Sequence, residues 1–599
     1  MTTQNPNNSP KIAEKYTWDL QAMYPEESQW KMDFDHSLVL AKEVAALEGG
    51  LTKSAQNLYN ALEKKDRLWQ LAEKVFVYSR MRKDEDNRAS KYIEMAGQSN
   101  ILLSEISKLL AFFTPELLGA EKDLVFGYIA DSPELEIYRH YLEEVFRVKD
   151  HVLSQEEERI LAATGQVLHA PIEIFTAFNN ADMKFGTITN DQGQEEELTH
   201  GNYSKFLESK NQATRKTAFE AMYVPYKNNT NTLATAYDFN VRTNGVSAEL
   251  RNYEGAKSSA LSSDNIQESV YDNLVAQVRE SLPSLHKYMT IRKRALKLDD
   301  LNMYDLYVPI VHQEEKTYTF EDAVDLMCRA LEPLGEEYVL AAREGVKTRW
   351  VDVYECQGKT SGAYSFGCYD SLPYILLNFD GKLKDVFTLV HEMGHSMHSY
   401  YTRRSQPYIY GGHSIFTAEV ASTVNEVLLM HYLIENAESS EEKAYLNNLY
   451  LEGFRSTLFR QTMFAEFEDL AHKASKDGTI LTSDWLCENY GALNKAYQGD
   501  QVIQNPEIAY EWSRIPHFYR AFYVYKYATG YSAANAIAKG LLEGGKKEQE
   551  NYLDFLSSGE SDYPIELLKI AGVSMDTPEP VQEAMETFAG LVDSMDKLI

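Results

Sequence analysis

Cysteines, long apolar runs and excess positive charge are all scarce in this chain of 599 residues. The 4 cysteines form no C-x-x-C pair, which argues against a disulfide framework and against a thioredoxin-like redox motif. No stretch approaches about 18 apolar residues, so no membrane-spanning helix is predicted. Acidic residues outnumber basic ones by 90 to 59, and the net charge of −31 argues against binding to nucleic acid or to an anionic membrane.

The beginning of the chain is polar. Residues 1–10 contain neither the basic region nor the apolar region of a secretory signal peptide. Because the chain also has few cysteines, we expect a cytoplasmic protein. With 44% hydrophobic and 12% aromatic residues the chain can bury a large core, but the composition does not indicate an oligomeric state.

The segment His391-Glu392-Met393-Gly394-His395 is an H-E-x-x-H motif. It follows a turn at Asp380-Gly381 and has helical periodicity, with an apolar stripe formed by Val386, Val390, Met393, Met397 and Tyr401. Two histidines four residues apart project from one face of a helix, so both imidazoles can bind one zinc ion while Glu392 activates the attacking water. The motif therefore predicts a zinc peptidase.

The third metal ligand distinguishes the families of zinc peptidases. A metzincin requires Gly three residues and His six residues after the second histidine, where this chain has His398 and Tyr401. Spacings typical of thermolysin-like and aminopeptidase-like enzymes would place a glutamate near residue 414 or 415, where the chain has Ser414 and Ile415. Neither arrangement fits.

Glu419 is the next candidate ligand. It lies in a second segment with helical periodicity, for which Thr417 is the expected N-cap. The link between the two helices contains Pro407 and Gly411-Gly412, which allow the second helix to fold back on the first. Glu419 can therefore reach the metal.

Two further polar residues lie near these ligands in the sequence. His398 falls on roughly the same face as His391 and His395, but three consecutive turns of one helix cannot converge tetrahedrally on one ion, so we expect it beside the site. Glu426 lies seven residues after Glu419 and either holds a ligand histidine or is an ordinary solvated or helix-capping glutamate.

Several segments together resemble one peptidase family. They are Lys15 to Leu20, Gly362 to Asn378, His391 to Tyr400, Ala418 to Glu426 and Ile515 to Tyr519. With these segments the chain resembles, over nearly its whole length, the oligoendopeptidase F members of the thimet-oligopeptidase-like family of zinc metallopeptidases. The resemblance implies one zinc ion per chain on His391, His395 and Glu419, with Glu392 as the catalytic base.

Two other elements are candidates for the site. The β-prone segment Tyr374 to Phe379 precedes the metal helix, and it is either an edge strand that pairs with an extended peptide or an ordinary core strand. His517 is followed by tyrosines at four-residue spacing, Tyr519, Tyr523, Tyr527 and Tyr531, with Tyr525 to one side. Such a stripe is by default amphipathic packing. The resemblance implies instead that His517 and at least one of Tyr523, Tyr525 and Tyr527 stabilise the oxyanion, and we take His517, Tyr523 and Tyr527 as candidate catalytic residues.

The chain as a whole has the periodicity of a mainly α protein. The clearest helical runs are Asn100 to Phe113, Tyr141 to Leu168, Asp272 to Leu298 and Leu446 to Ala474. Strand signals predict a hairpin near residues 184–199 and a small β-sheet at residues 350–379, beside the metal helix. We divide the chain at the hairpin, into a helical N-terminal region at 1–200 and a catalytic region at 201–599. The resemblance implies a two-lobed zincin-type peptidase with a deep substrate channel, which would admit short unfolded oligopeptides.

Three alternatives remain open at this point. A zinc exopeptidase of the dipeptidyl carboxypeptidase type has similar ligand spacing, and peptides with blocked ends would reveal it. A non-catalytic helical protein that binds peptides would fail a cleavage assay, although the intact Glu392 argues against it. A structural scaffold without a cofactor would contain no metal.

Overall fold

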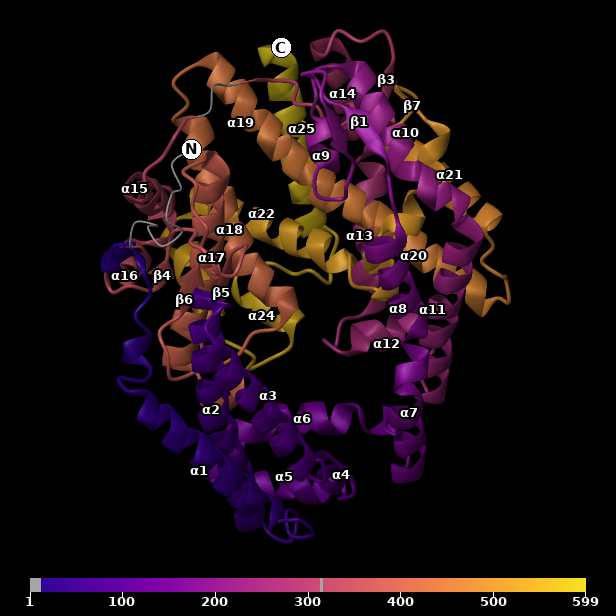
Figure 1. Cartoon of the computed structure of the whole chain (residues 1–599). Coiled ribbons are helices and arrows are strands. Elements are labelled where there is room, and N and C mark those ends of the chain that lie inside the picture. Colours follow the sequence, from indigo (N-terminus) through magenta and orange to yellow (C-terminus); the bar gives the residue numbers. More distant parts are fainter. Residues whose placement is uncertain (1–11, 313–315) are drawn as a thin grey trace, which may run out of the picture. The chain divides into compact units, whose positions relative to one another are not determined.

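The computed structural model describes residues 12–312 and 316–599. Residues 1–10, in which we expected no signal peptide, lie outside the described part. Most of the described residues are helical, and the strands among them are short (Figure 1). The prediction of a mainly α fold with small sheets is confirmed.

The chain forms two compact units, each made of three sequence segments. Unit 1 consists of Met1–Lys149, Glu315–Tyr432 and Ile537–Gly572, and unit 2 consists of Asp150–Glu314, Leu433–Ala536 and Val573–Ile599. Neither unit is one continuous stretch, so neither coincides with the regions 1–200 and 201–599. That division stays a prediction.

The first helices of unit 1, from α1 to α6, share one apolar core. The helices of unit 1 are α1 Glu27–Ala45, α2 Ala55–Glu85, α3 Ser90–Leu109, α4 Phe113–Leu118, α5 Lys122–Asp131, α6 Arg139–Arg147, α15 Phe320–Ala330, α16 Glu336–Lys347, α17 Leu383–Ser405, α23 Lys546–Leu556 and α24 Pro564–Ile570. Helix α2 starts after Ser54, whose side chain caps it by accepting a hydrogen bond from the Asn57 N–H. Trp30 is buried between α1 and α2, and its indole N–H donates to the Val75 carbonyl at 2.8 Å.

The three-stranded sheet of unit 1 continues this core to the metal helix. Strand β6 Tyr374–Leu376 lies in the centre, parallel to β4 Val351–Asp352 and antiparallel to β5 Tyr364–Phe366, with Ser365 opposite Ile375. Of the two alternatives for residues 374–379, the edge strand is therefore wrong and the core strand is confirmed, because partners occupy both sides of β6 and the residues of β6 are fully buried. The outer strands are β4 and β5, and β5 packs against α17.

Helix α17 carries the H-E-x-x-H motif. At its start Asp385 accepts hydrogen bonds from the N–H groups of Lys382 and Asp380, at 2.9 and 3.1 Å, and Gly381 adopts a φ of 82° that a glycine tolerates. All members of the predicted apolar stripe, from Val386 to Tyr401, are buried. Because the core holds this stripe, the orientation of α17 is fixed, and its ligand histidines lie on another face of the helix.

Helix α18 Ile415–Glu435 follows α17 after a short link and continues across the division between the units at Tyr432. It begins at Ile415, and the hydroxyl of Ser414 accepts a hydrogen bond from the Thr417 N–H at 3.4 Å. The prediction that Thr417 is the N-cap is wrong, since Ser414 takes that position and Thr417 lies inside the first turn. The two residue types cap helices comparably, so sequence alone did not separate them.

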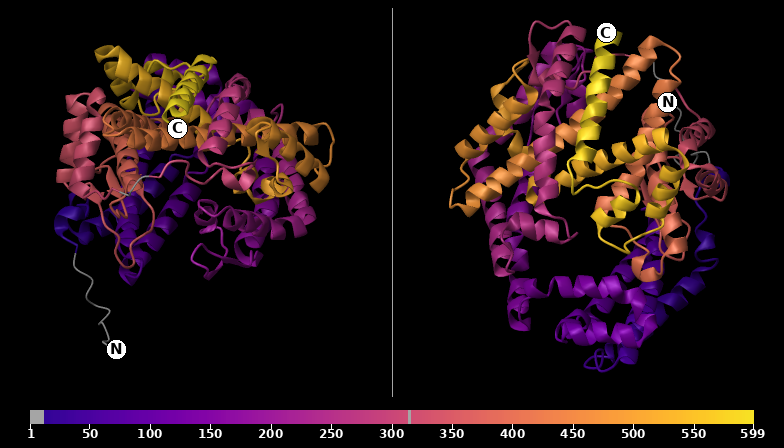
Figure 2. Two further views of the ribbon diagram at one scale, coloured as in Figure 1. Left: turned by 90° about the horizontal axis from the view of Figure 1, so that it is seen from above. Right: turned by 180° about the vertical axis from the view of Figure 1, so that it is seen from behind.

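Unit 2 is a second helical body. Its helices are α7 Gln155–Leu168, α8 Ala170–Ala177, α9 Tyr203–Leu207, α10 Gln212–Asn228, α11 Thr230–Leu250, α12 Ala256–Ser262, α13 Glu268–Glu280, α14 Leu282–Ala295, α19 Ser440–Gly453, α20 Arg460–Lys476, α21 Ser483–Gln498 and α25 Glu579–Leu598. Helix α22 Tyr525–Gly544 crosses the division between the units at Ala536. Figure 2 shows the yellow C-terminal helix α25, which packs against α13, α14 and α19.

The strands of unit 2 are short. The predicted hairpin is present as β1 Thr187–Thr189 and β2 Glu195–Glu197, which pair antiparallel around a turn with Gly193 at a φ of 76°. Strand β3 Leu301–Asn302 pairs in parallel with β7 Val502–Ile503.

The predicted long helices are interrupted. Asp272 to Leu298 breaks at Ser281, because Pro283 lies in the first turn of a new helix. Leu446 to Ala474 contains a π-helical segment, Phe454–Phe459, between α19 and α20. Amphipathic periodicity continues through both breaks, so it did not reveal them.

One helical run, Glu156–Asp182, is long and apolar enough on average to span a membrane, although no such segment was expected. A single run of this kind is weak evidence for a membrane helix, and this one is interrupted by Pro171. It supports no further conclusion.

Candidate active site

Three metal-ligand side chains converge in unit 1. The Nε2 atoms of His391 and His395 lie 3.2 Å apart, and Glu419 Oε2 lies 3.6 Å from the first and 3.8 Å from the second. A tetrahedral zinc ion with bonds of about 2.0–2.1 Å requires ligand atoms about 3.3 Å apart. The donor set therefore fits zinc in both chemistry and spacing.

The close approach of α17 and α18 brings Glu419 to the two histidines. A β-carbon on Gly394 would lie 2.6 Å from the Cα of Ser422 and 2.8 Å from the carbonyl oxygen of Ala421. Only glycine permits this contact, which lies one helical turn from Glu419. The fourth residue of the motif thus sets the distance between the helices.

Buried hydrogen bonds fix the same pair of helices. The side-chain amide of Asn425, on α18, donates to the Val390 carbonyl on α17 at 3.2 Å. It also exchanges hydrogen bonds with the buried Tyr338 hydroxyl at 3.0 and 3.2 Å. Asn425 and Tyr338 were not singled out in the sequence. Asn425 is 35 positions from Val390 and 87 positions from Tyr338, and contacts between such distant positions give no local signal.

Outer hydrogen bonds orient both ligand histidines. Glu426 Oε1 lies 2.8 Å from His391 Nδ1, so the ring donates from Nδ1 and its Nε2 lone pair is available to a metal. The Ala418 carbonyl accepts a hydrogen bond from the His395 ring. Burial lowers the pKa of His391, but the hydrogen bond and charge of Glu426 outweigh it and raise the pKa overall. A proton therefore competes with the metal at His391.

Glu392 lies between the two histidines in sequence and is buried, with 8% of its surface exposed. Burial raises the pKa of its carboxyl to about 7, against the opposing effects of His391 and of a hydrogen bond from the Ser365 N–H. A carboxylate with a pKa near neutrality is suited to accept and return a proton. Its contact with Ser365 also links it to the outer strand β5.

His398 lies outside the converging donor set, which consists of His391, His395 and Glu419. It is buried and its ring stacks on that of His413, with centroids 4.1 Å apart. Burial lowers the pKa of His398 well below its ordinary value and that of His413 to about 4. Both rings are therefore neutral, and His413 was not anticipated from the sequence.

The candidate residues near the C-terminus form a cluster in unit 2. The His517 ring lies with its centroid 6.3 Å from that of Tyr523 and 5.9 Å from that of Tyr527, and the two phenol rings lie 5.4 Å apart. The Tyr527 hydroxyl is 3.5 Å from His517 Nε2. All three side chains are partly exposed, so a ligand can reach them.

The other tyrosines of this segment pack against aromatic residues or lie in the core of unit 2. Tyr525 is fully buried, Tyr519 stacks on Phe175 with centroids 4.4 Å apart, and Tyr531 contacts Phe454 edge to face. The segment therefore contains both kinds of residue considered in the sequence, since Tyr519 and Tyr525 are buried core tyrosines whereas Tyr523, Tyr527 and Tyr531 are partly exposed. A turn with Phe522 at a φ of 53°, its N–H bonded to the buried Glu468 at 2.8 Å, directs Tyr523 away from the core.

A helix with H-E-x-x-H and a glutamate from the following helix, converging at this spacing, defines the site of a metal-dependent peptidase. Comparison with known proteins agrees. Residues 205–587 match the model of Peptidase family M3, and residues 116–185 match that of Oligopeptidase F. The chain belongs to Peptidase family M3, which makes it a peptidase and implies a metal cofactor.

Several relatives extend over the whole chain. Oligopeptidase PepF of Bacillus subtilis is 44% identical, with 100% of this chain and 89% of that protein covered, and an oligoendopeptidase F homolog of Lactococcus lactis is 40% identical, with 99% and 98% covered. A solved structure described as a peptidase from Chlamydophila abortus is 35% identical, with a TM-score of 0.94 and 98% and 99% covered. Oligoendopeptidase F from Enterococcus faecium is 36% identical, with a TM-score of 0.73 and 96% and 99% covered.

Proposed function

We propose that this chain is a zinc-dependent endopeptidase that hydrolyses internal bonds of short, unfolded oligopeptides in the cytoplasm. The convergence of His391, His395 and Glu419 at 3.2 to 3.8 Å is the observation that carries the proposal. Membership in Peptidase family M3 and similarity to oligoendopeptidases F support it.

The roles of the residues follow from their positions. His391, His395 and Glu419 would hold a zinc ion, which would supply a Lewis acid for the scissile carbonyl and for the attacking water. Glu392 takes the proton of the attacking water and passes it to the leaving amine, for which its pKa of about 7 is suited. Glu426 holds His391 in the tautomer that leaves Nε2 free for the metal.

Strand β5 is the candidate for holding the substrate backbone. It is one of the two outer strands of its sheet, its residues are partly exposed, and Ser365 in its centre contacts the proposed catalytic base. An extended peptide that adds to this strand gains main-chain hydrogen bonds without a strong sequence requirement. The catalytic base would then lie next to the bound backbone.

His517, Tyr523 and Tyr527 are proposed to stabilise the negative charge that develops on the carbonyl oxygen. Their mutual contacts and partial exposure support this role, and tyrosine hydroxyls or an imidazole can donate the required hydrogen bonds. Tyr525 is not proposed for it, because its side chain is fully buried.

Cleavage of a peptide library tests the proposed specificity. Peptides of roughly 6 to 20 residues should be cut internally, whereas folded proteins and long unstructured chains should resist if the site lies in an enclosed channel. Mass spectrometry of the products, with and without blocked termini, identifies the cut bonds. Efficient digestion of casein-like chains would contradict the size limit, and a requirement for a free C-terminal carboxylate would indicate a dipeptidyl carboxypeptidase instead.

Metal analysis tests the ligand set. Protein purified without added metal should contain about one zinc per chain, and Glu419→Ala should lose most of it. His398→Ala is the matched comparison, because His398 lies on the same helix as the ligand histidines but outside the donor set. Full zinc in Glu419→Ala together with loss in His398→Ala would show that the wrong third ligand has been chosen.

A further inference from the structure

Unit 2 contains four arginine side chains that form ion pairs with only two carboxylates. Glu452 pairs with Arg292 at 2.8 Å through one oxygen and with Arg455 at 2.7 Å through the other. Burial opposes ionisation of Glu452, but the two arginines hold its pKa at about 2, so the carboxylate is ionised. This charge is divided between two cations.

The second carboxylate of the group is divided in the same way. One oxygen of Glu511 is 2.7 Å from Arg460 and 3.4 Å from Arg514, while the other accepts a hydrogen bond from Tyr490. Burial again opposes ionisation, yet the nearby arginines hold the pKa of Glu511 below its ordinary value. Among the described residues no third carboxylate pairs with Arg292, Arg455, Arg460 or Arg514, so four positive charges face two negative ones.

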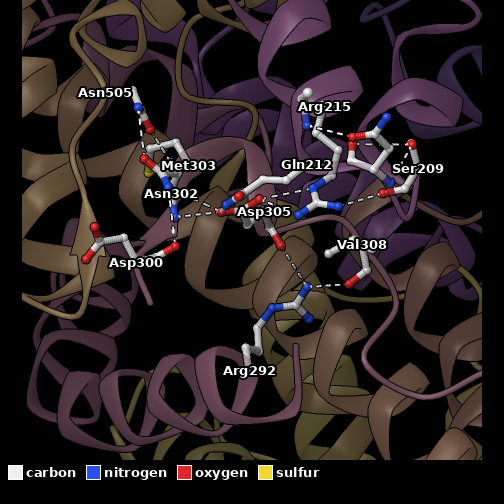
Figure 3. A network of polar contacts seen from close by, with 12 residues as sticks. Ser209, Gln212, Arg215, Arg292, Asp300, Asn302, Met303, Asp305, Val308 and Asn505 are labelled. Carbon is white, nitrogen blue, oxygen red and sulfur yellow. Dashed lines mark hydrogen bonds and ion pairs between the residues drawn. The ribbon is translucent and has the colours of Figure 1, made fainter. Parts of the chain in front are cut away.

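Asp305 lies near this group but does not balance it. Its carboxylate is bound by Arg215 at 2.6 Å, by the Gln212 amide at 3.1 Å and by the Asn302 N–H at 2.9 Å (Figure 3). Near Asp305, the Nη2 atom of Arg292 donates hydrogen bonds only to backbone carbonyls, to that of Asp305 at 3.3 Å and to that of Val308 at 2.7 Å. The charge of Asp305 is therefore already matched by Arg215.

A small cavity of about 30 Å³ lies among the unmatched cations. Arg455, Arg460 and Arg514 line it together with Glu511 and Tyr307, and Arg514 also lies 5.5 Å from the ring centre of Tyr203. No described protein group accepts a hydrogen bond from the buried Nε of Arg514. The cavity thus combines an excess of positive charge with an unused donor.

The physical consequence is a need for a negative charge. Unpaired charge is costly to bury in protein, and the structure provides more guanidinium groups here than carboxylates to match them. We propose that this cavity binds a small monovalent anion such as chloride, held by Arg455, Arg460 and Arg514. The volume corresponds to only one or two water-sized species, which suits a monatomic anion better than a peptide carboxylate. The site lies within unit 2 and is separate from the three proposed metal ligands in unit 1.

Chloride-35 NMR tests the site directly. Wild-type protein should broaden the chloride line, bromide should reverse the broadening by competition, and Arg455→Gln should weaken chloride binding at least tenfold. Arg455→Gln is suitable because Glu452 keeps Arg292 as a partner. Both proteins retain the metal centre, so any chloride bound there contributes equally. Arg294→Gln, at an exposed position of the same unit, is the matched control and should behave like the wild type.

Thermal unfolding provides a second measurement. Replacing gluconate by chloride at constant ionic strength should raise the Tm of the wild type by at least about 2 °C and leave that of Arg455→Gln unchanged. If Arg455→Gln fails to fold, wild-type crystals soaked in bromide decide, because an anomalous peak should lie among the three arginines. The proposal is overturned by the absence of line broadening in the wild type, by equal broadening in Arg455→Gln, or by a cavity without bromide.

Discussion

Gly394→Ala should weaken metal binding although it alters no ligand. The added β-carbon would lie 2.6 Å from the Ser422 Cα and 2.8 Å from the Ala421 carbonyl oxygen. Carbon atoms in van der Waals contact are about 3.5–4.0 Å apart, so α18 must retreat from α17 by roughly 1 Å. Both contacts are backbone atoms, which cannot rotate away as the end of a side chain can.

Two opposing effects determine how Gly394→Ala changes the stability of the fold. Alanine gains about 1 kcal/mol over glycine in a helix interior, whereas overpacking of a core costs about 1–3 kcal/mol and here also displaces Glu419, one turn from Ser422. Metal sites tolerate about 0.2 Å in ligand distance, so the shift should matter more for zinc than for folding. We expect zinc affinity to fall by about 10- to 100-fold, as it does when groups supporting metal ligands are removed.

Competition with a chelator measures the zinc affinity of Gly394→Ala. Gly97→Ala is the control, because Gly97 lies in α3 of the same unit and, apart from its chain neighbours and the backbone of its own helix, no atom lies within 4 Å of its would-be β-carbon. That variant should bind zinc normally and gain about 0.5–1 kcal/mol in stability. Zinc affinity of Gly394→Ala within about twofold of the wild type would refute the argument that this glycine sets the ligand geometry.

Three further predictions concern the proposed catalytic groups. Glu392→Gln should keep zinc and fold but lose several orders of magnitude in turnover, and activity within about tenfold of the wild type would exclude Glu392 as the base. Glu426→Gln should lower zinc affinity by about 10- to 100-fold in a chelator titration, which an unchanged affinity would contradict. His517→Ala, Tyr523→Phe and Tyr527→Phe should each lower kcat by about 10- to 1000-fold with zinc content intact and a smaller change in KM. If all three leave kcat within about twofold, these residues only pack.

Local sequence patterns predicted the metal helix well. The apolar stripe of α17 and the motif follow one helical period, and the core in the structure covers the predicted face. Glu419 was placed on a following helix, and α18 does bring it to the histidines. Features that depend on residue spacing within one helix or two consecutive helices could therefore be predicted from the sequence.

Contacts between segments that lie far apart in the sequence could not be predicted. For the strand at Tyr374 an edge position and a core position both stayed open, because the sequence shows a strand but not its partners. In the structure β4 pairs with one side of this strand and β5 with the other. Gly394 stood within the motif as an unspecified position, and its role depends on backbone atoms of the next helix. The shared carboxylates of Glu452 and Glu511 join residues up to 160 positions apart and left no local pattern.

The division of the chain has a consequence for how the enzyme would lose activity. The three proposed metal ligands and Glu426 all lie in unit 1, within a stretch of 36 residues, whereas His517, Tyr523 and Tyr527 lie in unit 2. Heat or denaturant that opens unit 2 first would therefore stop turnover while the zinc stays bound. Inactivation and metal release would then be two separate events, and an assay of metal content alone would overestimate the fraction of working enzyme.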